Sequence, residues 1–300
     1  MKRRRKPRAL ALLLLAVLLA GGCSSGSALS SGSGAPTPSV SEAPASSGDP
    51  AAAEPQWEAL ALPEQGRAAF VSRSLRFGGV NPAPLALFEE GGQVRAFEEA
   101  IRSSERIEGI LDVAEPDFDL VLQSEGGARK AYHLWLPLGG AKTEGMKGMA
   151  MEAANTHTGY TISATAAKQL AELVLSQGYT SEQAARNGDV VFGPGRQFNE
   201  DVWQAFVEKV GRGEQASVQV TSFTIEGDPI FENLSHVEGT IRYQKDTRFD
   251  GFGSREHPRV DFCKRLEEGE AGEDKVYSLA ECGEEVSPFL LRLAGAGGGN

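Results

Sequence analysis

A short acidic segment, Glu226-Gly227-Asp228-Pro229, is the part of the sequence best suited to chemistry. It follows an alternating stretch typical of a strand, so Glu226 and Asp228 would project to the same side if the strand continued. Asp246 and Asp250 would lie nearby if their segment pairs with this one. Four carboxylates could bind a hard cation such as Ca²⁺ through oxygen ligands, and two could act as an acid–base pair.

The same segment also has the composition of a structural turn. Asp accepts local backbone N–H bonds, Gly allows positive φ, and Pro fixes φ. The spacing of Asp246 and Asp250 departs from that of D-x-D-x-D-G calcium loops. We favour the turn, and we keep a binding site and an acid–base pair as alternatives.

His133 and Trp135 form a second candidate site. On a predicted strand over 131–138 they face away from Tyr132, Leu134 and Leu136, because side chains alternate along a strand. They would form either the wall of a pocket or a second buried layer under a helix.

No known catalytic or cofactor motif can be assembled from the sequence. The histidines are scattered without an H-E-x-x-H pattern, and neither a Walker loop nor a G-x-G-x-x-G fingerprint occurs. We therefore expect no enzyme, no metal and no cofactor.

The N-terminus predicts export. Met1–Arg8 is basic, and the apolar run Ala9–Ala20 is shorter than the roughly 20 residues that a membrane span needs, so residues 1–22 are typical of a signal peptide. Ala20-Gly21-Gly22-Cys23 resembles a bacterial lipobox. That resemblance implies that Cys23 is acylated, with palmitate or a similar chain, and anchors the protein on the extracellular side of the cell membrane. An ordinary secretory signal with a chance cysteine is the alternative.

Composition limits the partners. The 300 residues contain 30 Lys+Arg and 41 Asp+Glu, a net charge of −11 that becomes −17 once the six basic residues of the signal segment are removed. Such acidity argues against nucleic acid, whose phosphates are bound through Lys and Arg. Residues 23–55, rich in Ser, Gly, Ala and Pro, predict a disordered tether.

The remaining chain predicts two small α+β domains, 56–178 and 179–290, followed by a flexible tail over 291–300. Each would have an antiparallel sheet with one or two packed helices. In the first domain we expect strands at 68–77, 117–123, 131–138 and 159–162, and helices at 94–104 and 163–176. In the second we expect a helix capped by Asn199 and ending at Gly211, and strands at 188–192, 217–225, 240–244, 259–265 and 275–280.

Several short motifs support these domains. The first domain resembles the YhfM-like domain of Gram-positive lipoproteins at four motifs, which occur in the same order: Gly109–Leu111, Glu115–Leu122, His133–Leu136 and Thr158–Ser163. The stretch from Gly188 to Cys282 resembles domain-of-unknown-function family 4362, whose hallmark stands here as Thr224–Ile230. Where that family often has His-Gly, this chain has Pro194-Gly195, so no role for that histidine carries over. Neither resemblance implies an activity.

Cys263 and Cys282 remain as a pair if Cys23 is lipidated. Because disulfides form outside the cell, we expect a bridge within one meander of strands, with free thiols or half a metal site as alternatives. The function that follows is a non-enzymatic module that binds a small ligand or an envelope protein. A cell-envelope hydrolase using Glu226 and Asp228, and a structural spacer, are the alternatives.

Overall fold

A computed structural model describes residues 57, 60–193, 196–253, 258–283 and 288–294. All of them belong to one compact unit of the chain. The expected signal peptide, Cys23, the tether over 23–55 and Pro194-Gly195 lie outside the described residues.

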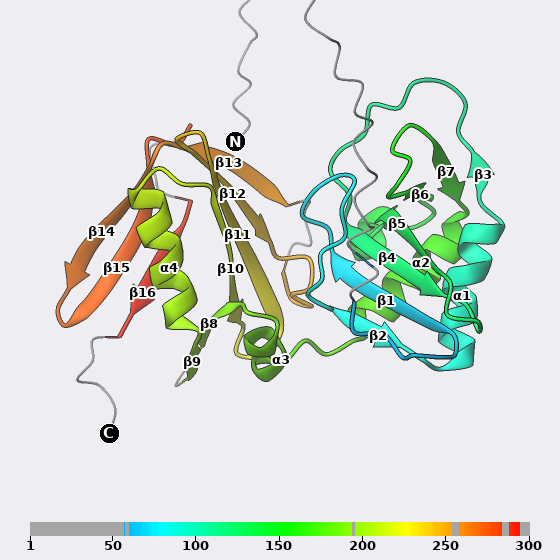
Figure 1. The fold of residues 1–300 in the computed structure, drawn as a ribbon, viewed down its shortest axis with the longest axis horizontal. Coiled ribbons are helices and arrows are strands. Elements are labelled where there is room, and N and C mark those ends of the chain that lie inside the picture. Colours follow the sequence, from blue (N-terminus) through cyan, green and yellow to red (C-terminus); the bar gives the residue numbers. More distant parts are fainter. Residues whose placement is uncertain (1–56, 58–59, 194–195, 254–257, 284–287, 295–300) are drawn as a thin grey trace, which may run out of the picture. The chain divides into compact units, whose positions relative to one another are not determined.

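The N-terminal region is built on a seven-stranded antiparallel sheet with strand order β2-β1-β4-β5-β6-β7-β3. Its strands are β1 (Ala68–Arg73), β2 (Ala86–Phe88), β3 (Glu105–Arg106), β4 (Phe118–Gln123), β5 (Arg129–Trp135), β6 (Gly148–Glu152) and β7 (Gly159–Ile162). Helices α1 (Gly91–Arg102) and α2 (Ala164–Leu175) lie next to each other along this sheet (Figure 1). A short 3₁₀ helix occupies Gly140–Thr143.

Helix α2 shows why the local sequence folds as expected. The Ser163 hydroxyl accepts a hydrogen bond from the Ala166 backbone N–H at 3.3 Å, which satisfies one of the free donors of the first turn. Ala167, Leu170 and Val174 recur at three and four residues and are buried. The predicted hairpin is confirmed as β4 and β5, although β5 ends at Trp135.

The C-terminal region contains a six-stranded sheet with order β13-β12-β11-β10-β8-β9 and a three-stranded sheet with order β14-β15-β16. The strands are β8 (Val190–Gly193), β9 (Arg196–Phe198), β10 (Ala216–Phe223), β11 (Pro229–Val237), β12 (Thr240–Asp246), β13 (Arg259–Cys263), β14 (Arg265–Ala271), β15 (Asp274–Ala280) and β16 (Leu290–Leu293). The helices are α3 (Ser181–Arg186) and α4 (Glu200–Gly211). Because β8 pairs with β10 in parallel, the larger sheet is mixed, and the α+β class holds for both regions.

Asn199 is the N-cap residue of α4, as predicted, but its side chain makes no capping bond. It adopts a left-handed conformation (φ 59°), and its amide donates to the carbonyls of Ala185 and Asp189, both at 2.8 Å. One prediction in this region is wrong. The tail does not begin at residue 291, because Leu291 and Leu293 of β16 are buried against the core.

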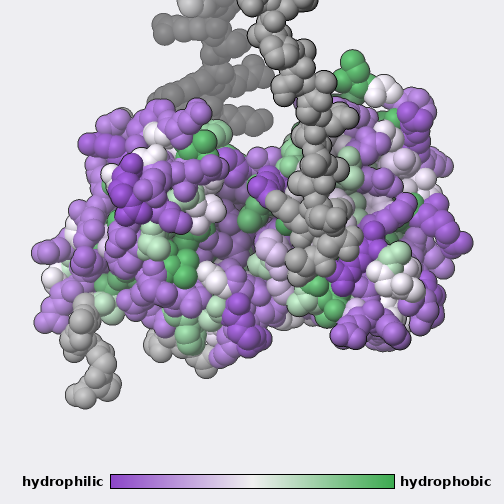
Figure 2. Space-filling view, viewed as in Figure 1, coloured by the Kyte–Doolittle hydropathy of each residue, from purple (hydrophilic) through white to green (hydrophobic). Residues whose placement is uncertain are grey.

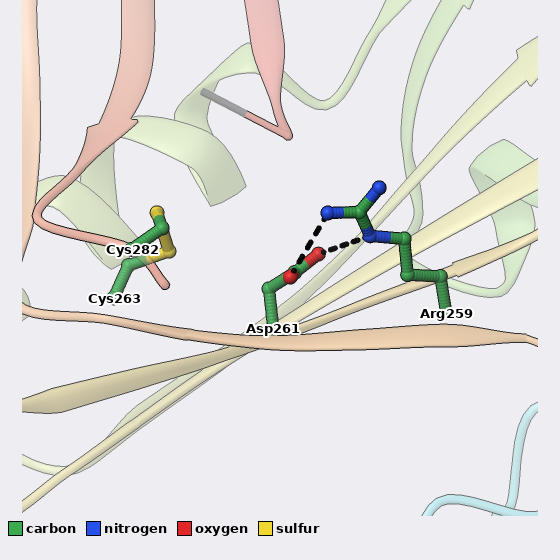
Figure 3. The surroundings of a disulfide bond; sticks show 4 residues. All are labelled: Arg259, Asp261, Cys263 and Cys282. Atoms are coloured by element: carbon green, nitrogen blue, oxygen red, sulfur yellow. Dashed lines mark hydrogen bonds and ion pairs between the residues drawn. A yellow bond between two sulfur atoms is a disulfide. The ribbon is translucent and has the colours of Figure 1, made fainter. Parts of the chain in front are cut away.

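The Cys263–Cys282 disulfide is present, as predicted. Cys263 ends β13 and Cys282 follows β15, so the bridge joins two sheets and not two strands of one meander. Figure 3 shows Arg259 and Asp261 on the same side of β13 as Cys263, with their side chains paired at 3.0 Å.

The apolar core explains how the two regions pack. The cluster that holds α1 and α2 also contains Val191, Phe231 and Phe249 of the C-terminal region. The rings of Phe118 and Phe249 meet edge to face at 6.2 Å. A second cluster places Trp203 and Phe206 of α4 against residues of both C-terminal sheets. The regions that we predicted as two domains therefore share apolar core.

Candidate functional site

The hallmark segment forms the loop of the β10–β11 hairpin. β10 ends at Phe223 and β11 begins at Pro229, so the strand does not continue through Glu226 as the acid–base interpretation required. The Gly227 N–H donates to the Thr224 carbonyl at 3.1 Å, and the Thr224 N–H donates to the Asp228 carbonyl at 2.9 Å. Gly227 has φ 95°, the conformation for which glycine suits this turn.

The two turn aspartates bind backbone donors. Asp228 Oδ2 accepts the Gly251 N–H at 2.8 Å, a non-local bond where we expected a local one. Asp250 Oδ1 accepts the Phe252 N–H at 2.9 Å. The carboxylate of Asp228 thus ties the hairpin loop to the turn that follows β12. Glu226 is exposed and makes no ion pair or hydrogen bond to the described residues.

Asp246 belongs to a different environment from the other three carboxylates. It is buried, receives two bonds from the Arg248 guanidinium at 2.9 and 3.0 Å, and lies 3.5 Å from Arg73. Burial alone would raise the pKa of Asp246, but the bonds from Arg248 and the charges of both arginines lower it to about 2. Within the described ranges, no three His, Cys, Asp or Glu side chains are grouped to hold a metal ion. The four predicted carboxylates therefore do not form one cation site.

The arginine partners of Asp246 extend into a buried polar network that sequence reasoning missed. Arg73 donates to Gln219 and Asn233, both at 2.8 Å, and its guanidinium lies 4.3 Å from the centre of the Phe231 ring. Arg248 also forms an ion pair with Asp117. Apart from Arg73 Nε, which is buried without a hydrogen-bond partner among the described residues, the charged groups of this network pair with one another, so we interpret the network as structural.

Asp189 adds a second buried carboxylate beside this network. Its Oδ2 accepts bonds from Tyr179 (2.8 Å), Gln219 (2.8 Å) and Thr221 (2.7 Å). Burial raises the pKa of Asp189, and these three donors offset part of that effect. Asp189 lies in the predicted strand at 188–192, where a charged residue directly before Val190 and Val191 was the one signal that could have found it.

His133 is buried and Trp135 is partly buried, and both side chains are bonded within the N-terminal region. The Gly78 N–H donates to His133 Nε2 at 2.9 Å, so the ring proton is assigned to Nδ1, which donates to Asp119 at 2.8 Å. Trp135 Nε1 donates to the Ala114 carbonyl at 2.9 Å. The Phe77 ring packs against both side chains. The cover is thus the segment around Phe77 and Gly78, and not the helix that we expected.

A groove beside the hallmark hairpin is the strongest candidate for a binding site. It has a volume of about 820 Å³ and lies where the segment after α2, the hairpin loop and Phe249 meet. Its described lining residues are Leu175–Glu182, Val191, Phe223, Thr224, Ile225, Gly227, Asp228, Pro229 and Phe249. Ligand sites in proteins commonly have this size, and this lining combines apolar and polar residues in similar number.

A second cavity of about 820 Å³ is a weaker candidate. Its floor includes Gln219, Asn233 and Asn187, but the amide groups of these residues are already bonded within the protein. On the face that Figure 2 shows, hydrophilic residues predominate and apolar residues form separate small patches. No single large apolar surface is visible there.

The geometry defines an α+β protein with two antiparallel-rich regions and a groove beside one hairpin. Comparison with protein families agrees with this division. The model of the YhfM protein family matches residues 86–177, and that of a domain of unknown function (DUF4362) matches residues 187–278. Both resemblances predicted from the sequence are thus confirmed. No curated protein and no solved structure gives a significant match to the chain.

The two family matches divide the groove between them. Leu175–Gln177 fall within the YhfM match, and the hairpin loop and Phe249 fall within the DUF4362 match. The residues Gly178–Glu182 connect the two matches. Among the residues that the structure describes, no helix is long and apolar enough to cross a membrane.

Proposed function

We propose that this chain is a lipid-anchored protein on the outer side of the cell membrane, and that its folded part binds a ligand without converting it. The anchor rests on the lipobox-like segment that ends at Cys23 and on the tether that follows. The binding role rests on the groove of about 820 Å³ beside the hairpin.

The anchor is tested by Cys23→Ser with Ser24→Ala as the matched control. The wild type and Ser24→Ala should incorporate labelled palmitate and sediment with membranes. Cys23→Ser should lose the label and leave the membrane fraction. Equal membrane association of both variants would overturn the lipid anchor.

The binding role is tested by filling the groove. Gly178 lines it, has no positive φ, and has open space where a side chain would begin, so Gly178→Phe should occupy the groove without backbone strain. Gly126, in the turn between β4 and β5, has the same properties and serves as the control.

A thermal-shift screen would use the chain without residues 1–23, with soluble cell-wall fragments and spent-medium metabolites as probes. Binding raises the melting temperature by mass action. A saturable shift in the wild type and Gly126→Phe, absent in Gly178→Phe, is the expected result. A shift that persists in Gly178→Phe would place the binding site outside the groove and overturn the groove as the site. No shift with any probe would favour a structural spacer.

The non-enzymatic part of the proposal is supported by the state of the two carboxylates. Acid–base catalysis needs groups held within hydrogen-bond reach of the reacting atoms, whereas Glu226 is exposed and Asp228 already accepts the Gly251 N–H. We expect cell-wall fragments to remain intact after incubation with the protein. Turnover that disappears in Glu226→Ala would establish the hydrolase instead.

A further inference from the structure

The charge of the groove limits what it can bind. Its described lining contains two carboxylates, Glu182 and Asp228, and no Lys, Arg or His. Glu226 stands exposed between two lining residues, Ile225 and Gly227. An anionic ligand would therefore meet like charge at Asp228 and Glu226, whereas a cation would be attracted.

Helix α2 adds to the same field. Its last turn contains no basic residue, and Leu175, Ser176 and Gln177 at its C-terminal end line the groove. The C-terminal end of a helix carries partial negative charge and favours cations. This contribution comes from the backbone and is independent of the acidic side chains.

Part of the remaining lining is apolar and aromatic, beside neutral polar residues such as Gln177 and Thr224. Tyr179, Val191 and Phe249 are buried beside the groove, and Phe223 is partly buried. Ile225 is 93 % exposed. Such a surface suits an apolar body, and the aromatic rings add attraction for a nearby ammonium or guanidinium group.

We infer that the ligand of this groove is a short cationic peptide in which Lys or Arg alternates with apolar residues. The inference rests on the binding function proposed above and names its ligand class. A bare metal ion fits less well, because the described residues provide no group of three ligating side chains. The volume of about 820 Å³ suits a ligand of a few residues.

The test uses three labelled tetrapeptides with identical apolar positions: Leu-Arg-Leu-Arg, Leu-Gln-Leu-Gln and Leu-Glu-Leu-Glu. Fluorescence anisotropy with the chain lacking residues 1–23 should show saturable binding of the arginine peptide. We expect affinity about tenfold lower for the glutamine peptide, no measurable binding of the glutamate peptide, and weaker binding at high salt.

Variants locate the interaction. Asp228→Asn keeps an oxygen that can accept the Gly251 N–H, so it removes charge and preserves the tie to the neighbouring turn. Asp228→Asn and Glu226→Gln should each lower the affinity for the arginine peptide about threefold to tenfold. Glu273→Gln, an exposed neutralisation outside the groove lining, should leave the affinity unchanged.

The outcomes separate this inference from the proposed function. Equal binding of the arginine and glutamine peptides, both lost in Gly178→Phe, would overturn the cationic class and keep the groove as a binding site. Two other outcomes are that the arginine peptide binds Gly178→Phe as well as the wild type, or that it loses as much affinity in Glu273→Gln as in Asp228→Asn. Either result would show attraction to the acidic surface in general and overturn the inference. No binding of any peptide would also overturn it, while the screen above decides the proposed function independently.

Discussion

The guanidinium of Arg73, on β1, lies 3.5 Å from the carboxylate of Asp246, at the end of β12. Both side chains are almost completely buried. The contact joins the two regions of the chain through charge, at the place where Phe118 and Phe249 join them through apolar packing. The stability of the protein and its dependence on pH should both reflect this contact.

Removing the Asp246 charge should destabilise the protein strongly. Asp246→Asn would leave two buried guanidinium groups with one carboxylate fewer, and breaking a buried pair in this way typically costs about 3–5 kcal/mol. Urea denaturation measures the loss. Arg265→Met, at an exposed pair with Glu267 and Glu281, should change the free energy of unfolding by less than about 1 kcal/mol. Similar losses for the two variants would contradict the structural role of Asp246.

The same residue predicts a pH dependence. The pKa of Asp246 is about 2 in the folded protein against an ordinary value of 3.8, so the folded state binds this proton more weakly than the unfolded state. Its contribution is fully present above about pH 4 and is lost as the pH falls through about 2. The stability difference between the wild type and Asp246→Asn should therefore be constant from pH 7 to about pH 5 and shrink below pH 4. A difference that grows on acidification would refute this assignment.

Asp119 and Asp189 should have the opposite effect on how stability depends on pH. Burial raises the pKa of each carboxyl, despite hydrogen bonds that lower it, so folding is favoured as these groups take up protons. Asp189→Asn cannot take up this proton, so its loss of stability relative to the wild type should be larger at pH 4 than at pH 7 if the amide replaces the hydrogen bonds of the carboxyl. Denaturation at the two pH values measures this, and an equal loss at both would contradict it.

Substitution of Gly227, the hallmark glycine, should destabilise the protein because of its backbone conformation. Gly227 has φ 95° and open space around its missing side chain, so Gly227→Ala should cost about 1–2 kcal/mol through strain alone. Gly126→Ala, where φ is not positive and space is also open, should be neutral or slightly stabilising. Thermal unfolding of both variants gives the comparison. Equal melting temperatures would mean that the turn tolerates L residues.

Removal of the disulfide should cost about 3 kcal/mol, because Cys263 and Cys282 are 19 residues apart and the bridge restricts the unfolded chain. The double variant Cys263→Ala/Cys282→Ala should show this loss in urea. Thiol titration of the denatured wild type, before and after reduction, checks that the bridge forms. Two titratable thiols at these positions without reduction would contradict it.

The sequence was most informative where structure is decided locally. The Ser163 cap, the spacing of apolar residues in α2 and the short strand at 159–162 could all be recognised from neighbouring residues. The disulfide was predictable because only two cysteines remain after Cys23.

Central strand β11 escaped prediction for a physical reason. Its buried positions include the polar residues Glu232, Asn233 and His236. They interrupt the alternation of apolar residues by which a strand is recognised in a sequence. These polar side chains are buried because partners elsewhere in the chain bond them, as Arg73 bonds Asn233.

The candidate site was only partly predictable. Asp228 does line the groove, but Asp246 is paired with Arg73 and Arg248 instead. No local sequence pattern indicates this pairing. His133 and Trp135 are bonded within the N-terminal region. Tyr179, Phe249 and Leu175 meet only after the chain folds, so sequence reasoning could not assign them to one groove.

The ion pairs that Asp246 and Arg248 form with the N-terminal region also affect how such a chain can evolve. Arg73 precedes both family matches, and Asp117 lies in the YhfM match, yet both neutralise charges within residues 187–278. A recombination event that carried residues 187–278 alone into another gene would leave these counterions behind. In this lineage the two modules are expected to be inherited, duplicated and lost together, unless compensating substitutions at 246 and 248 arise first.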